Sequence, residues 1–266
     1  MGIFDGVLFC SDFDGTLAIK GKISPENAEA IAYFRQEGGI FCPTSGRRPH
    51  FFHEAPEVFV EGGYYIVLNG SMIMQYGATP EEDVIVWESV IPKELALRFA
   101  HDTLDLPGVR VISLHREHTP FQIRMPEGTH ADIDAADGQY RKIAISHEKG
   151  RADVLREALE PKYRDVFFFS SSSKKIYEAQ MHGADKGSTV LRLKELLGAH
   201  TLVTAGDYEN DIPMLKAADI GYAVGDALDT VKAAAHRVTV PCAEHAIAAI
   251  VRELAAERTG KAVKNM

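Results

Sequence analysis

The sequence predicts an α/β protein: a Rossmann-like, doubly wound parallel-sheet core into which a smaller α/β domain is inserted. Short apolar runs of strand type alternate with segments of helical spacing near both ends of the chain, which is typical of a parallel sheet covered by helices. Polar, glycine-bearing segments follow several of these runs directly, as loops at the carboxyl ends of parallel strands do. With 266 residues, 45% of them hydrophobic, the chain is long enough for a large core and a second domain.

Local signals mark the elements of the core. Ser24 followed by Pro25 starts a helix, because a serine side chain caps the first amides and proline fits the first turn. Asn69-Gly70 separates two apolar runs and favours the positive φ angles of a type I′ hairpin turn. Core strands are expected at 7–10, 40–42, 65–68, 72–75, 202–205, 220–224 and 238–240, and core helices from 25, over 187–197 and over 244–257.

The middle of the chain has its own pattern and is expected to form the inserted domain. Turn-forming residues at 77–83 indicate an exit linker, and residues 181–184 indicate the return linker. The expected division is a discontinuous core of residues 1–79 and 183–266 with an inserted α/β domain of residues 80–182. Within the insert, strands are expected at 85–90, 109–114, 142–146, 166–169 and 176–179, with helices from 92 and 151.

Composition limits the partners that the chain can take. Its 29 Lys+Arg against 38 Asp+Glu give a net charge of -9, which repels nucleic acid and anionic membrane surfaces. No apolar run reaches membrane-spanning length and the N-terminus has no signal-peptide pattern, so we expect a cytoplasmic protein that binds neither nucleic acid nor membrane. Cys10, Cys42 and Cys242 are odd in number and lie in apolar stretches, which favours reduced thiols. The sequence indicates no obligate protein partner.

The acidic pair Asp12 and Asp14 follows the first strand directly and is the sharpest chemical signal. Two carboxylates this close repel each other and require a cation or a shared proton. Mg²⁺ can supply that cation, and it lets a carboxylate approach an anionic phosphate. For this pair alone, an acidic turn without chemistry is the alternative, because so short a pattern recurs by chance.

Three further segments end a core strand or start a helix in the same way. Thr44, Ser45 and Gly46 end the second strand and offer hydroxyls and open amides to a phosphate oxygen. Lys186 opens a helix, where its ammonium can neutralise a phosphoryl group. Residues 206–211, Gly-Asp-Tyr-Glu-Asn-Asp, add a second acidic cluster. Each has an ordinary explanation by itself, as a turn, a surface lysine or a helix cap, but together they are expected to converge on one edge of the sheet.

The four motifs, in this order, resemble those of the haloacid dehalogenase (HAD) superfamily of aspartyl-phosphate hydrolases. The resemblance covers almost the whole chain and is greatest to the Cof-type branch, which carries a large α/β cap of the C2 type after the third core strand. The insert is then expected to be that cap. The residues that match the four motifs are 11–17, 45–47, 184–187 and 206–211.

The resemblance implies a role for each acidic residue of these motifs. Asp12 would be the nucleophile and a Mg²⁺ ligand. Asp14 would be the general acid/base and would bind Mg²⁺ through its backbone carbonyl. Asp207 would complete the coordination by the protein, with Asp211 as a further or water-mediated ligand.

The resemblance also implies which residues hold the substrate. Lys186 would be catalytic and would hold phosphoryl oxygens together with the hydroxyl and amides of the second motif, while Asn210 would orient Lys186 or touch the phosphate itself. The candidate phosphate or substrate contacts are Thr44, Ser45, Gly46, Arg47, Asn69 and Asn210.

The expected function is a Mg²⁺-dependent phosphatase that acts on a small phosphorylated metabolite, a sugar phosphate first, through an aspartyl-phosphate. The cap is expected to close over the substrate and exclude water. Two alternatives stay open: a phosphotransferase or phosphomutase that uses the same aspartyl-phosphate, and a signalling phosphoacceptor that does not turn over.

Two regions depart from the pattern or carry no signal. Where the family has a polar stretch ending in Asp-Gly after the last strand, this chain has residues 241–245, from Pro241 to His245. The sequence gives this loop no role. It also leaves open whether four polar residues of the cap contact the substrate: His115, Arg116, His118 and Arg124.

Overall fold

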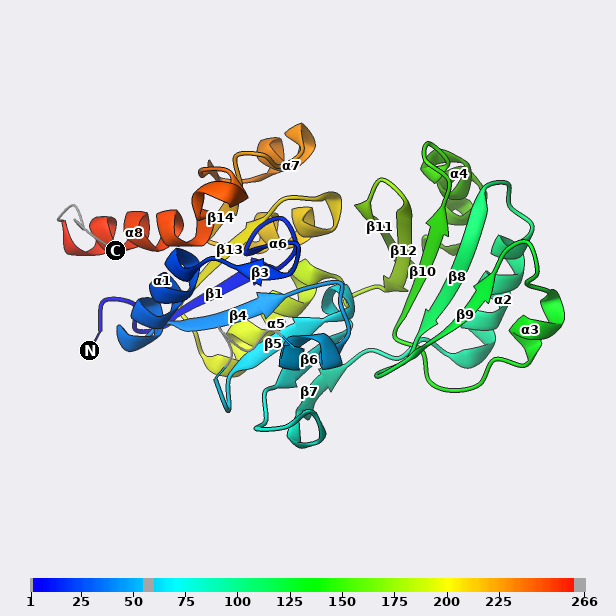
Figure 1. Cartoon of the computed structure of the whole chain (residues 1–266), viewed down its shortest axis with the longest axis horizontal. Coiled ribbons are helices and arrows are strands. Elements are labelled where there is room, and N and C mark those ends of the chain that lie inside the picture. The colour runs from blue at the N-terminus through cyan, green and yellow to red at the C-terminus, as the bar shows by residue number, and fades with distance from the viewer. Residues whose placement is uncertain (1, 55–59, 261–266) are drawn as a thin grey trace. The chain divides into compact units, whose positions relative to one another are not determined.

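The computed structural model describes residues 2–54 and 60–260 of the chain (Figure 1). The chain divides into two compact units. The larger unit consists of Met1–Val86 and Lys186–Met266, and the smaller unit is Trp87–Asp185. The smaller unit thus begins several residues later, and ends a few residues later, than the insert of 80–182 expected from the sequence.

The larger unit is built on an eight-stranded sheet with the strand order β15-β14-β13-β1-β4-β5-β6-β7. β1 runs parallel to both of its neighbours, β13 and β4, and the parallel part continues outward through β14, β15 and β5. β6 then runs antiparallel to β5. The predicted Rossmann-like α/β core is confirmed. Its strands are β1 (Val7–Asp12), β4 (Ile40–Thr44), β5 (Tyr64–Val67), β6 (Met72–Gln75), β7 (Val84–Glu88), β13 (Thr201–Gly206), β14 (Ile220–Ala223) and β15 (Arg237–Val238).

The first and last helices of the larger unit, α1 and α8, pack against each other and share one apolar core with β1 (Figure 1). α1 starts as the sequence predicts, because Ser24 Oγ accepts the N–H of Asn27 at 3.2 Å and Pro25 is the first helical residue. The helices of this unit are α1 (Pro25–Gln36), α5 (Lys186–Leu197), α6 (Ile212–Ala217), α7 (Asp229–Ala234) and α8 (Ala246–Thr259).

The carboxyl ends of the three central strands lie side by side. The register pairs Asp12, the last residue of β1, with Thr44, the last residue of β4. On the other side of β1, Ser11 pairs with Ala205, one residue before the end of β13. Because these strands are parallel, the segments that follow them all leave the sheet at the same edge.

The hairpin between β5 and β6 differs from the predicted turn. Val67 pairs with Met72, so four residues connect the strands and the two-residue type I′ turn is wrong. The predicted positive φ is present at Asn69 and Gly70, and it extends to Leu68. The turn is longer because it is fixed by contacts with other segments of the larger unit, which the local sequence does not contain.

The strand expected over 85–90 in the insert lies instead at β7, on the edge of the larger sheet. The side chain of Asp83, just before β7, explains this placement. It accepts hydrogen bonds from the hydroxyl of Tyr65 at 2.6 Å and the backbone N–H of Gly77 at 2.8 Å, and it contacts His53 Nε2 at 2.9 Å. These bonds tie the start of β7 to the core.

The smaller unit is a five-stranded antiparallel sheet in the order β11-β12-β10-β8-β9, with its own apolar core (Figure 1). The sequence missed β9, of whose residues only Ile123 is buried. Its strands are β8 (Val109–His115), β9 (Pro120–Arg124), β10 (Lys142–His147), β11 (Phe167–Ser173) and β12 (Ile176–Met181), and its helices are α2 (Lys93–Leu104), α3 (His130–Asp134) and α4 (Ala152–Tyr163).

Two other predictions concern the whole chain. Cys10, Cys42 and Cys242 are buried free thiols, as expected. None of the helices within 2–54 and 60–260 combines the length and the apolar character needed to cross a bilayer.

Candidate active site

Asp12 and Asp14 differ in exposure although only one residue separates them. β1 is buried along its whole length and delivers Asp12, which is 6% exposed, to the carboxyl edge of the sheet. Phe13 turns into the core, where its ring meets those of Phe51 and Phe52 edge-on, with centroids 5.3 and 5.5 Å away. Asp14 therefore emerges at the surface, with 46% of its side chain exposed. The carboxylate of Asp12 is therefore shielded from water, whereas that of Asp14 is in contact with it.

Lys186 reaches Asp12 from a segment far away in the sequence. Its Nζ donates to Asp12 Oδ1 at 2.6 Å and to Asp211 Oδ1 at 2.5 Å, and its side chain is fully buried. Gly187 permits this approach, because a Cβ there would lie 2.6 Å from the backbone of Pro213 at the start of α6. Burial alone would lower the pKa of Lys186, but the charges of Asp12 and Asp211 raise it, so the ammonium form is favoured.

The loop after β13 folds around the side chain of Asp211. Asp211 Oδ2 accepts the backbone N–H groups of Asp207 at 2.9 Å and Tyr208 at 3.1 Å. Asp207 Oδ1 in turn accepts the hydroxyl of Thr16 at 3.0 Å. A Cβ on Gly15, which has a φ of +90°, would lie 2.7 Å from Asp207 Oδ2, so glycine is required for this close approach. The first and fourth motifs are therefore joined directly.

Three carboxylates converge at this edge. Asp12, Asp207 and Asp211 each offer an oxygen, and these oxygens lie within 4.8 Å of one another. Burial and the charge of Asp211 raise the pKa of Asp12 well above its usual value, against the lowering effect of Lys186. Burial and Asp211 also raise the pKa of Asp207 to about 7. Three carboxylates around the Lys186 ammonium leave an excess of negative charge away from water.

This donor set fits a hard divalent cation. Carboxylate oxygens are the ligands that Mg²⁺ and Ca²⁺ prefer, and a bound cation would remove the repulsion that raises both pKa values. Asn210, next to Asp211 in the chain, has a buried Oδ1 that finds no hydrogen-bond donor among the described residues. Such an orphan acceptor suits a donor that comes from a bound ligand or from a water on a cation.

The segment after β4 lies level with Asp12 and offers groups that can bind phosphate. Thr44 and Ser45 are 0% and 1% exposed. Ser45 Oγ accepts the N–H of Arg47 at 3.2 Å, which leaves the hydroxyl hydrogen for another acceptor. Thr44 Oγ1 lies 3.5 Å from the backbone oxygen of Cys42, the acceptor within the same strand. Ser45 is thus the better donor of the two hydroxyls.

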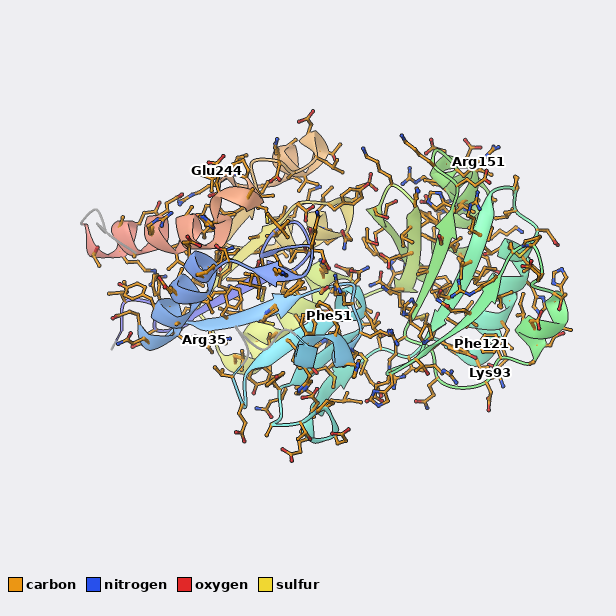
Figure 2. The ribbon with its side chains drawn as sticks, viewed as in Figure 1. Arg35, Phe51, Lys93, Phe121, Arg151 and Glu244 are labelled. Carbon is orange, nitrogen blue, oxygen red and sulfur yellow. The ribbon has the colours of Figure 1, made fainter. Side chains whose placement is uncertain are left out.

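Arg47 pairs with Asp14 through two hydrogen bonds. Nε and Nη2 of Arg47 donate to the two carboxylate oxygens of Asp14 at 2.6 and 2.7 Å. The guanidinium carbon also lies 3.6 Å from the ring centroid of Phe51, which is labelled in Figure 2. A bidentate pair that is stacked on a ring restricts the orientation of Asp14 more than an isolated surface ion pair does.

The loop of residues 241–245 lies beside the acidic cluster. Burial and the charges of Asp226 and Asp207 raise the pKa of the Cys242 thiol to about 12. The backbone N–H of Cys242 donates to Asp226 Oδ1 at 3.0 Å. His245 has a φ of 62°, in the left-handed region that glycine favours. The loop therefore presents a neutral, largely buried thiol to the site.

The structure brings the four motifs together at one edge of the larger sheet. The sequence assigns no role to three residues that contact the site: Thr16, Phe51 and Thr189. Thr16 lies within the first motif, so its hydroxyl could have been noticed. Phe51 and Thr189 contact Arg47 and Gly70 only because the fold brings these segments together. The cap candidates all belong to the smaller unit, and whether they contact a substrate stays a prediction: His115, Arg116, His118 and Arg124.

Comparisons with known proteins agree with the four motifs. A family profile described as haloacid dehalogenase-like hydrolase matches residues 9–251. Phosphatase YwpJ of Bacillus subtilis (strain 168) is 36% identical over 298 residues, covering 93% of this chain and 99% of that protein. The 5-amino-6-(5-phospho-D-ribitylamino)uracil phosphatase YcsE of the same organism is 27% identical over 248 residues, covering 92% and 94%.

Solved structures share the fold. The HAD subclass IIB sugar phosphatase BT4131 superposes with a TM-score of 0.73 at 20% identity, covering 95% of this chain and 98% of that chain. The profile spans most of the sequence, and both curated relatives match nearly from end to end. The chain therefore belongs to the haloacid dehalogenase-like hydrolases, the family that its motifs resemble, and to their Cof-type branch.

Proposed function

We propose that the chain is a Mg²⁺-dependent phosphatase that hydrolyses a small phosphorylated metabolite through a phosphoryl-Asp12 intermediate. The observation that carries the proposal is the position of Lys186 Nζ, buried between Asp12 and Asp211 at 2.6 and 2.5 Å, in a cluster that also contains Asp207. A carboxylate can attack an anionic phosphate only where positive charge offsets the repulsion. Here the Lys186 ammonium contacts Asp12, and the three carboxylates suit a divalent cation.

The acidic residues divide into metal ligands and supports. Both oxygens of Asp211 already accept hydrogen bonds, from Lys186 and from two backbone amides. Asp12, Asp207 and the backbone carbonyl of Asp14 are therefore the proposed direct ligands, and Asp211 is proposed to act through a water. When bound, Mg²⁺ supplies positive charge that lets the phosphate approach the nucleophile.

In the first step a carboxylate oxygen of Asp12 attacks phosphorus in line. The new oxygen–phosphorus bond forms at Asp12 while the bond to the leaving alcohol oxygen breaks, and protonated Asp14 gives its proton to that oxygen. Lys186, the Ser45 hydroxyl and the Gly46 amide hold the phosphoryl oxygens as charge spreads over them.

In the second step Asp14, now ionised, takes a proton from a water that attacks the phosphorus of phosphoryl-Asp12. The bond between phosphorus and the Asp12 oxygen breaks, inorganic phosphate leaves, and Asp14 is protonated again. The bidentate pair of Arg47 with Asp14 supports this step, because it orients the ionised carboxylate.

The proposed substrate is a small phosphorylated metabolite, with sugar phosphates first. YcsE is named for a phosphate ester on a ribityl chain, and BT4131 is named a sugar phosphatase. We further propose that the smaller unit, Trp87–Asp185, is the cap that selects the substrate.

The test is phosphate release from p-nitrophenyl phosphate and then from a panel of sugar phosphates, with Mg²⁺ or with EDTA. We expect continuous release that EDTA and Asp12→Asn abolish, while Asp229→Asn, an exposed acidic residue of the same unit, retains it. Transfer of phosphate to an acceptor without release would identify a phosphotransferase or mutase. Labelling of the protein without turnover would identify a phosphoacceptor.

A further inference from the structure

The turn between β5 and β6, Leu68–Gly70, is strained and buried at once; we call it the left-handed turn. Leu68, Asn69 and Gly70 have φ angles of 52°, 58° and 106°. Residues with a side chain avoid this region, and here two such residues adopt it in succession. Leu68 and Asn69 are 0% and 1% exposed. Strain of this kind persists only where the surrounding residues hold the backbone in place, so the contacts of the turn show which segments hold it.

The backbone of the left-handed turn holds the segment after β4. Asn69 N–H donates to the Ser45 carbonyl at 2.9 Å, and Leu68 N–H donates to the Arg47 carbonyl at 2.9 Å. Ser45 N–H donates back to the carbonyl of Ile66 at 2.9 Å. The pairing between β4 and β5 therefore continues past the ends of both strands, through the residues that carry the proposed phosphate-binding groups.

The side chain of Asn69 links this segment to the loop after β13. Asn69 Oδ1 accepts from Asn210 Nδ2 at 3.0 Å, and the bond is buried. A Cβ on Gly46 would lie 2.8 Å from the same oxygen, so the amide of Asn69 fills the space that the glycine leaves open. With Asn210 Nδ2 bound to Asn69, Asn210 Oδ1 is the atom left without a donor among the described residues.

The third contact of the left-handed turn is with α5. Thr189 Oγ1 donates to the carbonyl of Gly70 at 2.6 Å, and Thr189 is fully buried. Thr189 lies one helical turn after Lys186, the residue that bonds Asp12. The same short turn thus contacts the segment of Ser45, the loop of Asn210 and the helix of Lys186.

We propose that Asn69 is a positioning residue: its amide sets the orientation of Asn210, and the left-handed turn fixes Ser45 and α5 in the geometry that phosphoryl transfer requires. The proposal rests on the phosphatase function proposed above. It differs from the expectation that Asn69 contacts the substrate, because the Oδ1 of a 1% exposed Asn69 is already bonded to Asn210.

The first test is a double-mutant cycle of Asn69→Gly and Asn210→Ala, measured as Mg²⁺-dependent release of phosphate from p-nitrophenyl phosphate. Glycine keeps the left-handed backbone and its N–H, and removes only the amide side chain. Each single variant is expected to lower kcat about 10- to 100-fold with KM nearly unchanged, because small misplacements of reacting groups act on the transition state. The double variant should be no slower than the slower single variant.

Orthovanadate separates positioning from substrate contact. Its inhibition constant should rise in Asn69→Gly by the same factor as kcat/KM falls, since it mimics the five-coordinate phosphorus, while that of inorganic phosphate stays near the wild-type value. Wild-type kcat in Asn69→Gly, a rise in KM with unchanged kcat, or single effects that multiply in the double variant would each overturn the proposal. A wild-type chain that releases no phosphate would overturn the proposed function and this inference with it.

The second test needs no change at Asn69, so it holds even where that variant folds poorly. Thr189→Val removes the hydroxyl that holds Gly70, and Thr189→Ser keeps it. We expect kcat to fall in the valine variant and to return to within a few-fold of wild type in the serine variant. Thr103→Val is the matched control, because Thr103 is also fully buried and donates to the carbonyl of Phe99 at 2.7 Å in the smaller unit. Equal kcat losses in Thr189→Val and Thr103→Val would contradict a role in positioning.

Discussion

Among residues 2–54 and 60–260, each unit buries one lysine against a carboxylate, and the two sites differ in charge. In the smaller unit Lys142 donates to Glu178 at 2.6 Å, and both side chains are 3% exposed. In the larger unit Lys186 donates to Asp12 and Asp211. The first pair is neutral as a whole, whereas the second cluster is negative and also contains Asp207. The Lys142–Glu178 pair has no net charge, so it needs no further ion. The cluster around Lys186 has a net negative charge, which favours the binding of a further cation. A bound cation is what the proposed phosphoryl transfer requires.

Loss of the lysine in the charged cluster should have the largest effect. Lys186→Met leaves a cluster of three carboxylates, of which Asp12 and Asp211 are buried, without its ammonium. It also removes a group that is proposed to hold the phosphoryl oxygens. We expect kcat for p-nitrophenyl phosphate to fall by about 10³-fold or more, with the fold retained in Mg²⁺. Steady-state kinetics and circular dichroism check this. A fall of less than about 10-fold would remove Lys186 from the catalytic machinery.

Loss of the guanidinium beside Asp14 should have a smaller effect on rate. Arg47→Ala removes the two hydrogen bonds that orient Asp14, while Asp14 itself remains. We expect kcat to fall about 10- to 100-fold, in line with imperfect placement of an acid/base group. Arg47→Lys should recover part of the loss, because lysine keeps the charge and loses the bidentate geometry. An Arg47→Ala enzyme whose KM alone changes would favour direct contact with substrate instead.

Stability without metal should depend on pH in the direction set by the raised carboxyl pKa values. The folded pKa of Asp207 is raised to about 7, above its unfolded value, so the folded state binds the proton more tightly. The contribution of this group is fully present below the unfolded pKa and is lost as pH rises toward 7. In EDTA we expect Asp207 by itself to lower the free energy of unfolding by about 2–3 kcal/mol between about pH 5 and pH 8, and Asp12 to act in the same direction.

Urea unfolding measures this slope. Mg²⁺ should abolish or reverse it, because a bound cation favours the ionised carboxylates. Asp207→Asn should make the slope in EDTA shallower, and the raised pKa of Asp12 should account for the slope that remains. A metal-free protein that becomes more stable over this pH range would contradict the account of the cluster.

The balanced pair should be replaceable, which is the smallest expected effect. Changing Lys142→Met and Glu178→Leu together exchanges a buried ion pair for apolar side chains of similar size. We expect the free energy of unfolding to stay within about 1 kcal/mol or to rise, since such exchanges are often neutral or stabilising. The rate of phosphate release from p-nitrophenyl phosphate should change by less than about 3-fold. A large loss of kcat in the Lys142→Met, Glu178→Leu variant would contradict the claim that only the cluster around Lys186 takes part in the reaction.

The sequence predicts the meeting of Asp12 and Asp207 from strand order alone, and it places Lys186 at the start of the helix that leads into β13. Parallel strands end at one edge, so residues that follow them directly are brought together whatever the rest of the chain does. The alternation of strands and helices is equally strong, which is why the Rossmann-like core is confirmed. These are properties of short segments, and the sequence contains them in full.

The remaining features depend on contacts between distant segments. The four-residue connection of residues 68–71 is fixed by Ser45, Thr189 and Asn210, none of which is near it in the sequence. The local sequence, Asn69-Gly70, favours a two-residue turn. The position of β7 depends in the same way on the bonds that Asp83 makes to the core, and no strand pattern contains them.

The central claim is that the phosphoryl group passes through Asp12, and trapping it there is the most direct test. An Asp14→Asn chain, which lacks the general base for the second step, is mixed with radiolabelled p-nitrophenyl phosphate and Mg²⁺, quenched in acid and mapped by mass spectrometry. Because p-nitrophenolate leaves without a proton, the first step can proceed although this variant also lacks the general acid. The account predicts a label on Asp12 that EDTA prevents and that Asp12→Asn, Asp14→Asn does not acquire. A label on another residue, or phosphate release by the wild-type chain without any labelled protein on the time scale of one turnover, would contradict it.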